Sequence, residues 1–443
     1  MTADRETFTS RLGLLATMIG VAVGIGNVWR FPYMVGRFGG AAFILFYLIL
    51  AALIGIPALM AEWSLGRHTR RGPVGAFERA GLPGGRIVGS LLFGGLTFAT
   101  AYYCNAVGWV LFHGLGQVGG WLGLGLSPGD ILPPETGVSA RAIGLQLAFT
   151  GTVVLASTLI VIRGLRSGIE PASRFLTPLV FVALLVLLVR AVTLPGAGAG
   201  LAWMLKFDLG SLSAGAAMAA LGQLVFSLGL GGTFMVVYGS YLSDDMPLDH
   251  PAIWTVVGDT GAGILAGLAI FPAVFALGLE PSSGPGLLFF TLPGVFAEIP
   301  GGAAVGALFF LALGGAAYLS AVAAFEVLVA GLVDNTALER TGAAWAVAGA
   351  VMLLAVPPMI NMRIFVPWDL TFGSGFQTLG ALAAAITVGW SLNRSAALKE
   401  LYHISDARTR ALYHWVRWVI PGAILAVGVW WVLTEVLGVA GAL

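Results

Sequence analysis

The sequence predicts an all-α polytopic membrane protein with about eleven transmembrane helices, arranged as a 5+5 inverted repeat in which helices 1 and 6 are broken. Composition is the first observation behind this prediction. Of the 443 residues, 58% are hydrophobic and only 10% are charged, whereas a soluble domain carries about 25% charged residues. The second observation is a series of apolar windows long enough to cross a bilayer. The third is a pair of glycine-interrupted windows at corresponding positions of the two halves.

Hydropathy places the individual spans along the chain. Apolar windows of about 20 residues, the length that crosses a bilayer, recur throughout the sequence. They fall near residues 12–36, 40–65, 88–115, 142–162, 172–192, 213–241, 252–279, 301–333, 341–358, 370–392 and 414–440. A shorter amphipathic stretch near 285–299 predicts a re-entrant or surface hairpin. We therefore expect one domain over 1–443, with a first repeat over about 11–192, a second over about 213–392 and an additional helix over about 414–440.

Basic residues predict the orientation of these spans. If the N-terminus is cytoplasmic, the arginine-rich loops around residues 67–86, 163–174 and 394–417 all lie on the cytoplasmic side. The opposite side then has few basic residues, as the positive-inside rule requires. We expect a multi-pass protein of the inner (cytoplasmic) membrane, with its C-terminus outside.

Several functional classes are excluded or disfavoured by composition. The single cysteine, Cys104, excludes an internal disulfide and a thiolate metal cluster. A net charge of +1 gives no indication of nucleic-acid binding. No nucleophile–base pair or metal-ligand cluster indicates an enzyme.

Two spans are interrupted at mid-depth. In residues 11–33, Gly24, Gly26 and Asn27 break the first span, and in residues 222–241 a glycine run breaks the sixth. Irregular backbone at membrane depth must face protein or a water-filled cavity, because unpaired peptide groups are costly in hydrocarbon. Glycines can also serve only close helix packing. Two runs in matching positions favour a binding site built from freed carbonyls, amides and helix ends.

These segments carry a family resemblance. The first span, RLGLLATMIGVAVGIGNVWRFPY, together with EWSLGR at 62–67, AYYCNAVGW at 101–109, FSLGLGG at 226–232 and YGSY at 238–241, resembles the neurotransmitter:sodium symporter family, in particular its bacterial amino-acid transporters. The resemblance covers nearly the whole chain. It implies import of an amino acid coupled to Na⁺ by alternating access to one central site, in a functional monomer embedded in the lipid bilayer.

The resemblance also implies two sodium sites. The first site comprises the Ala22 carbonyl, the Asn27 side-chain oxygen, Ser227 and Asp259, completed by the substrate carboxylate. Oxygen ligands suit a hard cation. Because Asp259 supplies a negative charge there, we expect transport that does not depend on chloride. Asp259 can also be interpreted as the cap of a helix kink.

The second sodium site is expected to lack a ligand. The implied ligands are the carbonyls of Gly20, Val23 and Ala316 and the hydroxyl of Ser320. Leu319 occupies a position where the family offers a hydroxyl or a carboxylate, and leucine contributes no oxygen. One or two sodium ions therefore remain possible.

The implied substrate site lies between the two breaks. The substrate carboxylate would meet the amides of Ile25 and Gly26 and the Tyr103 hydroxyl, and the ammonium would meet carbonyls of Ala22, Phe226 and Ser227. Small residues line the side-chain pocket, which predicts a large hydrophobic or aromatic amino acid. The residues expected to complete the pocket are Ala99, Gly229, Gly232, Ser320 and Ala324.

Charged residues at both ends of the site are expected to form gates. On the outside, Arg30 would pair with Asp369 beside Gln223, and Phe226 would cover the substrate. On the inside, Arg5 would pair with Asp334 beside Tyr241. Glu62 is expected to accept hydrogen bonds from freed amides of the broken sixth span. The spacing of Gly168 and Pro178 would let the fifth span unwind.

Two further functions remain open from the sequence. Proton coupling on the same scaffold would use Asp259 or Glu62 as the titrating group. Because Leu319 gives no oxygen to the second sodium site, this alternative stays open. A membrane receptor or sensor that binds an amino acid without transporting it is the alternative of another class. The lack of an extended soluble domain argues against the sensor.

Overall fold

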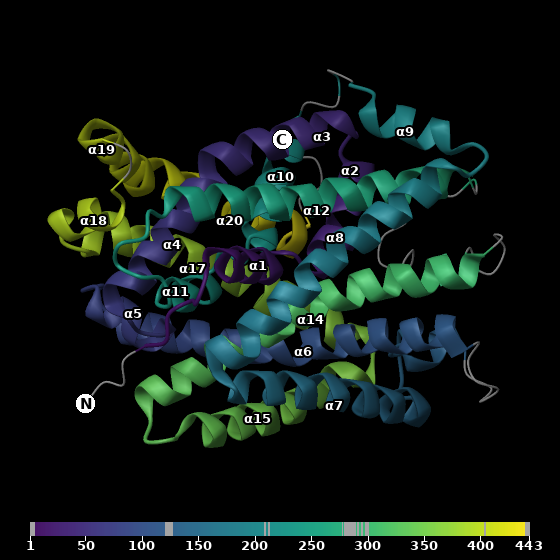
Figure 1. The fold of residues 1–443 in the computed structure, drawn as a ribbon, viewed down its shortest axis with the longest axis horizontal. Helices are drawn as coiled ribbons and strands as arrows, with labels where there is room; N and C mark the ends of the chain where they lie inside the picture. The colour runs from purple at the N-terminus through teal and green to yellow at the C-terminus, as the bar shows by residue number, and fades with distance from the viewer. Residues whose placement is uncertain are drawn as a thin grey trace.

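The computed structural model describes residues 5–119, 127–207, 213–276, 301–402 and 405–438, together with Gly210, Gly278, Phe289, Leu292, Pro293 and Phe296. Long helices run side by side along the longest axis of the molecule (Figure 1). The hairpin expected near 285–299 lies for the most part outside the described residues.

Among the described residues, nine helices are long and apolar enough to cross a membrane. They are Ala41–Thr69 (α3 and α4), Gly85–Gly119 (α6), Ala140–Ile162 (α7), Leu165–Val192 (α8, from Glu170), Asp249–Ala276 (α12), Gly302–Asn335 (α14), Arg340–Ile360 (α15), Met362–Ser391 (α16 and α17) and Asp406–Thr434 (α19 and α20). Shorter helices connect or cap them: Pro73–Arg79 (α5), Ala197–Leu205 (α9) and Arg394–Glu400 (α18).

Two broken spans complete the set. The first consists of Arg11–Ala22 (α1) and Gly26–Arg37 (α2, from Phe31), whose axes bend by 58°. The second consists of Ala214–Ser227 (α10) and Phe234–Gly239 (α11). A serine hydroxyl caps the start of each: Ser10 accepts from the Gly13 amide and Ser213 from the Ala216 amide. With the bent first pair counted as one span, up to ten spans are found in the described part of the chain, and Ala214–Ser227 is a shorter apolar helix at the position expected for the sixth.

Three spans begin earlier than hydropathy predicts. The fifth begins at Leu165 rather than near 172, the tenth at Met362 rather than near 370, and the eleventh at Asp406 rather than near 414. Polar residues at the start of these helices lower the apolarity of the sequence window, and in the fifth span they have hydrogen-bond partners. Glu170, for example, accepts hydrogen bonds from Thr9 and Ser10, so the helix continues through it.

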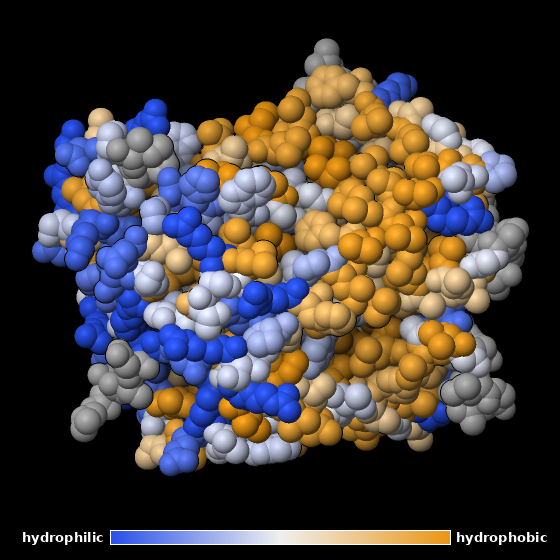
Figure 2. Space-filling view, in the orientation of Figure 1, coloured by the Kyte–Doolittle hydropathy of each residue, from blue (hydrophilic) through white to orange (hydrophobic). Residues whose placement is uncertain are grey.

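The bundle has a polar end and a central core. Hydrophilic residues gather at the end that carries α5, α18 and α19, whereas apolar residues cover the middle of the visible face (Figure 2). We call this the N-terminal end, because the described chain starts there. In α14, 78% of the most apolar window is buried, against 22% in Asp406–Thr434. Helix α14 is therefore central, and it packs against α6, α8 and α1.

Candidate functional site

A cavity of about 120 Å³ lies where the two broken spans meet α6, α14 and α17. Its wall combines freed backbone with small and aromatic side chains. It contains ten of the eleven predicted substrate residues and Asn27, which are Ala22, Ile25, Gly26, Asn27, Ala99, Tyr103, Phe226, Ser227, Gly229, Ser320 and Ala324. The structure thus brings together residues from four separate parts of the sequence.

Gly232 is the exception, and the expectation that it lines the pocket is wrong. A side chain there would meet the Gly380 carbonyl and the Phe77 ring, each 2.8 Å from its Cβ, and would not enter the cavity. Gly232 has φ +65°, a left-handed conformation that glycine adopts without strain. Its role is to shape the turn between α10 and α11. Ala99 and Ala324 are among the small residues that do line the cavity.

Sequence reasoning missed part of the apolar wall. Leu96 and Leu92 lie one and two helical turns before Ala99 on α6, and Phe372 and Phe376 are one turn apart in the tenth span. This helical spacing was the available signal for all four. Gln377 also lines the cavity, and its amide nitrogen donates to the Val225 and Phe226 carbonyls.

The predicted first sodium site forms a compact polar cluster in the core. The Asp259 side chain is fully buried. Its Oδ1 accepts from Asn27 Nδ2 at 2.6 Å and from Ser227 Oγ at 2.8 Å. Tyr47, which the sequence did not single out, donates to Asp259 Oδ2 at 3.2 Å. These three donors are neutral, so Asp259 provides the cluster with its negative charge.

Asn27 connects this cluster to the break in the first span. Its Oδ1 accepts from the Gly24 amide at 2.9 Å, while its Nδ2 faces Asp259 and Ser227. For the Asn27 oxygen to bind a cation beside Asp259, the amide group must rotate by half a turn about its terminal bond.

The residues of the predicted second sodium site also lie together. Ser320 Oγ is 3.3 Å from the Val21 carbonyl oxygen and 3.5 Å from those of Val23 and Ala316. The Leu319 side chain packs against Gly20: a Cβ built on Gly20 would be 2.9 Å from Leu319 Cδ1. Carbonyls of α1 and α14 therefore surround the serine hydroxyl, and the leucine lies at their edge.

Tyr103 connects α6 to both broken α1 and α14. Its hydroxyl is hydrogen-bonded to Ser320 and to the Ile25 backbone. At the neighbouring turn, Gln223 donates to the Gly26 carbonyl at 3.3 Å. A hydroxyl and backbone amides beside a helix start can bind a carboxylate.

The predicted outer gate residues lie close to one another, and one of them, Phe226, lines the cavity. The Arg30 guanidinium stacks on Phe226, with 4.5 Å between its central carbon and the ring centroid. Asp369 is close enough to Arg30 for their charges to interact, and it is hydrogen-bonded to Tyr102. Gly373 makes room for this contact, because any side chain there would overlap the Tyr102 hydroxyl. Tyr102, which the sequence did not single out, is thus part of this group.

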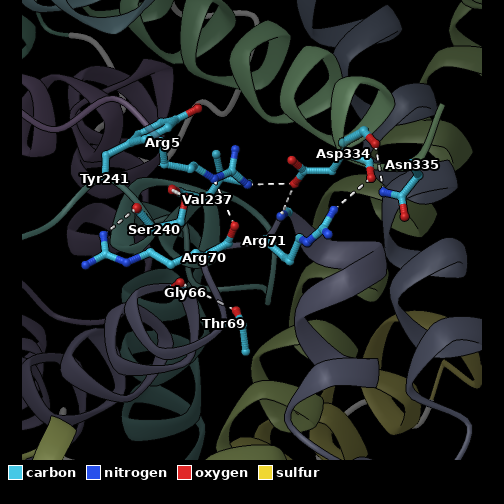
Figure 3. Close-up of polar contacts among 12 residues, drawn as sticks. Arg5, Gly66, Thr69, Arg70, Arg71, Val237, Ser240, Tyr241, Asp334 and Asn335 are labelled. Atoms are coloured by element: carbon cyan, nitrogen blue, oxygen red, sulfur yellow. Dashed lines mark hydrogen bonds and ion pairs between the residues drawn. The ribbon is translucent and has the colours of Figure 1, made fainter. Parts of the chain in front are cut away.

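The predicted inner gate is formed at the N-terminal end. Arg5 Nη2 is 2.6 Å from Asp334 Oδ2, and the Arg5 guanidinium lies 5.4 Å from the Tyr241 ring centroid (Figure 3). Asp334 also accepts from the Gly72 amide at 2.6 Å, and its carbonyl accepts from Arg71. Arg5, Asp334 and Tyr241 are thus brought together as expected.

Additional contacts reinforce this inner network. Arg70 donates to the Ser240 carbonyl (Figure 3) and to the Leu242 carbonyl, immediately after α11. Beneath Tyr241, the buried Glu326 accepts from the tyrosine hydroxyl and forms an ion pair with Arg340. Arg70 and Arg340 were missed, because an arginine in a loop between spans has the same sequence signal whether or not it is bonded.

Glu62 holds the break in the sixth span. Its Oε1 accepts from the amides of Gly231 and Gly232 at 2.8 and 3.0 Å. This is the contact that the resemblance implies. It compensates two peptide groups that the break leaves without helical partners.

The N-terminal segment is bonded to the start of the fifth span. Glu6 accepts from the Leu165 amide at 2.7 Å, and the buried Glu170 accepts from the Thr9 amide at 3.0 Å. Gly13 is required at the next contact, since any side chain there would overlap the Glu170 carboxylate. The segment around Gly168 is helical here.

Comparisons with known proteins agree with this architecture. The model of the sodium:neurotransmitter symporter family matches residues 5–118 and 138–437. Sodium-dependent transporters of Haemophilus influenzae and Bacillus subtilis are 32% and 30% identical, with coverage of 96% and 95% of this chain and 97% and 96% of theirs. A creatine transporter of Torpedo marmorata is 26% identical over 96% of this chain and 78% of its own.

A solved structure is similar over nearly its whole length. The crystal structure of MhsT in complex with L-phenylalanine superposes with a TM-score of 0.84 at 36% identity, and covers 96% of this chain and 99% of that one. The fold expected from the sequence, with its broken first and sixth helices, is therefore confirmed. The chain belongs to the sodium:neurotransmitter symporter family and is a multi-pass, sodium-dependent membrane symporter rather than an enzyme.

Proposed function

We propose that this symporter imports a large hydrophobic or aromatic amino acid. The observation that carries the proposal is the apolar compartment of the central cavity, where Ala99 and Ala324 leave space beside Leu96, Phe372 and Phe376. Burial of apolar surface in such a compartment contributes roughly 0.8 kcal/mol per methylene group. A large side chain therefore gains several times what alanine or glycine gains. The L-phenylalanine bound to MhsT supports the same substrate class.

The backbone of the substrate would bind at the break in the first span. The Ile25 and Gly26 amides and the Tyr103 hydroxyl face the cavity and suit a carboxylate. Carbonyls of Ala22, Phe226 and Ser227 suit the ammonium. The amino-acid backbone is thereby recognised separately from its side chain.

Sodium would be co-transported at two sites. In the first, Ala22, Asn27, Ser227 and Asp259 hold the ion together with the substrate carboxylate, which makes sodium and substrate binding interdependent. Because Asp259 provides the negative charge, transport would not depend on chloride. In the second, Gly20, Val23, Ala316 and Ser320 hold the ion between α1 and α14.

Alternating access would open the two gates in turn. The Arg5–Asp334 pair closes the N-terminal end, which we place in the cytoplasm on the basis of its arginines, and the Arg30, Phe226 and Asp369 group closes the other. This orientation puts the N-terminus inside, the C-terminus outside and the protein in the inner membrane. A functional monomer is part of the same proposal.

Proton coupling is the second candidate. Glu62 Oε2 is buried without a hydrogen-bond partner among the described residues, so no hydrogen-bond donor competes with a proton for this oxygen. Leu319 also reduces the oxygen set for a second sodium ion.

The first experiment is binding of a panel of amino acids to the purified protein, in sodium and in potassium at constant pH. The proposal requires one large hydrophobic or aromatic amino acid to bind in sodium and to lose most of its affinity in potassium. Equal binding in both salts would contradict sodium coupling. A further dependence on pH would then indicate protons. Tighter binding of glycine or alanine than of phenylalanine, tryptophan or leucine would overturn the substrate class.

A further inference from the structure

The second sodium site has a hydroxyl beside it that belongs to neither α1 nor α14. Thr177 lies on α8, immediately before Pro178, and is 6% exposed. A Cβ built on Gly20 would be 2.7 Å from Thr177 Oγ1 and 2.9 Å from Leu319 Cδ1. The Thr177 oxygen and the Leu319 methyl therefore contact the same backbone position of the first span.

The hydrogen-bonding state of this hydroxyl suits a cation ligand. Thr177 Oγ1 donates its hydrogen to the Ala16 carbonyl at 2.8 Å. A hydroxyl has one hydrogen and two acceptor lone pairs, so the oxygen keeps acceptor capacity after this bond. Hard cations prefer oxygen ligands of this kind.

We infer that Thr177 supplies to the second sodium ion the hydroxyl oxygen that Leu319 cannot supply. The inference rests on the two-ion coupling proposed above and adds a ligand from a third helix. Ser320 provides one hydroxyl from α14, and Thr177 provides the other from α8 across Gly20. The oxygen that Leu319 lacks on α14 is thereby supplied by a different helix that lies beside it in the fold.

This placement connects sodium binding to the fifth span. Pro178, the residue after Thr177, has no amide hydrogen, so it cannot donate a backbone hydrogen bond within the helix. Helix α8 can deform more easily at this point than elsewhere. A deformation of α8 would withdraw one ligand and release the ion, while a bound ion would hold α8 against α1.

The alternative is that Thr177 only ties α8 to α1 through the Ala16 bond. Both readings predict lower thermal stability when the hydroxyl is removed. Only the ligand reading predicts weaker sodium binding and its recovery when a hydroxyl is restored at residue 319.

The test measures binding of radioactive sodium to the purified full-length protein without amino acid. The variants are Thr177→Val, Thr177→Ser and the double variant Thr177→Val with Leu319→Thr. Each is also made with Asp259→Asn, which disables the first site so that the remaining signal reports the second. Thr158→Val is the matched control, because Thr158 is a fully buried threonine that donates to the Val154 carbonyl within α7.

We expect Thr177→Val to raise the sodium concentration for half-saturation about tenfold, the loss typical of one contact to a charged group. Thr158→Val should leave it unchanged. Thr177→Ser should bind more tightly than Thr177→Val, and Leu319→Thr should restore binding in the valine background. Unchanged sodium binding in Thr177→Val, with a lower melting temperature in potassium, would overturn the inference and leave the helix tie. If Asp259→Asn alone abolishes all sodium binding, two-ion coupling itself fails, and the inference fails with it.

Discussion

Replacement of Asp259 by asparagine tests the first sodium site most directly. The change keeps the size of the side chain and removes its charge. In the structure the carboxylate is fully buried and accepts from Asn27 at 2.6 Å, Ser227 at 2.8 Å and Tyr47 at 3.2 Å. Since all three partners are neutral, nothing in this cluster replaces the lost negative charge.

The expected magnitude follows from Coulomb's law. Two unit charges about 4 Å apart interact by about 4 kcal/mol at an effective dielectric constant of about 20. The asparagine oxygen retains part of this attraction as a dipole, so we take a loss of about 3 kcal/mol. Each 1.4 kcal/mol corresponds to a factor of ten. The sodium concentration for half-maximal amino-acid binding should therefore rise by about a hundredfold.

The assay is a sodium titration of phenylalanine binding to the purified protein, in chloride and in gluconate. Asp244→Asn is the matched control, because Asp244 pairs with Arg70 at the surface and its side chain is 81% exposed. The wild type should titrate identically in both anions. A titration of Asp259→Asn within threefold of the wild type would refute the ligand role. Chloride-dependent binding by the wild type would refute the anion argument.

Three other variants test the pocket, the inner gate and the N-terminal contact. Ala324→Phe fills the 120 Å³ cavity and should weaken phenylalanine binding at least tenfold while glycine binding changes less, as measured by competition. Asp334→Asn breaks the partly buried ion pair with Arg5 and should shift the equilibrium toward the inward-open state about tenfold or more. The measurement is hydrogen exchange of the N-terminal segment, which should become faster; unchanged exchange would contradict the gate. Gly13→Ala would overlap Glu170 and should lower the melting temperature by several degrees, whereas a neutral effect would contradict that close contact.

The sequence predicts the breaks in the spans better than it predicts the contacts across them. Gly24, Gly26 and Gly229 mark irregular backbone, and irregular backbone at membrane depth must face protein or a water-filled cavity. The direction in which a side chain at a glycine position would point depends on the φ angle and on the surrounding residues, which the sequence does not give. The sequence therefore predicts that Gly232 lines the pocket, whereas the structure places its left-handed turn against Gly380 and Phe77.

Contacts between distant helices carry no local signal. Asp259, Asn27 and Ser227 could be grouped only because the family resemblance brought them together. Tyr47 looks like any tyrosine in an apolar span, and Thr177 looks like a polar residue before a proline. Their positions follow from the way the second span packs against the seventh and the fifth against the first, which periodicity does not specify.

The two predicted gates are formed by different kinds of contact, and this difference bears on coupling. The outer group combines a cation–π stack of Arg30 on Phe226 with the Tyr102–Asp369 bond. The inner network contains the Arg5–Asp334 ion pair and hydrogen bonds that involve the backbone. Arg70 donates to carbonyls at the end of the sixth span, and the Gly72 amide donates to Asp334. Each hydrogen bond contributes only about 1 kcal/mol, but inward opening must break several together. A ligand shifts such an equilibrium only by its different affinity for the two states. A sodium ion held between α1, α14 and α8 would favour the inner-closed state, so its release would permit inward opening.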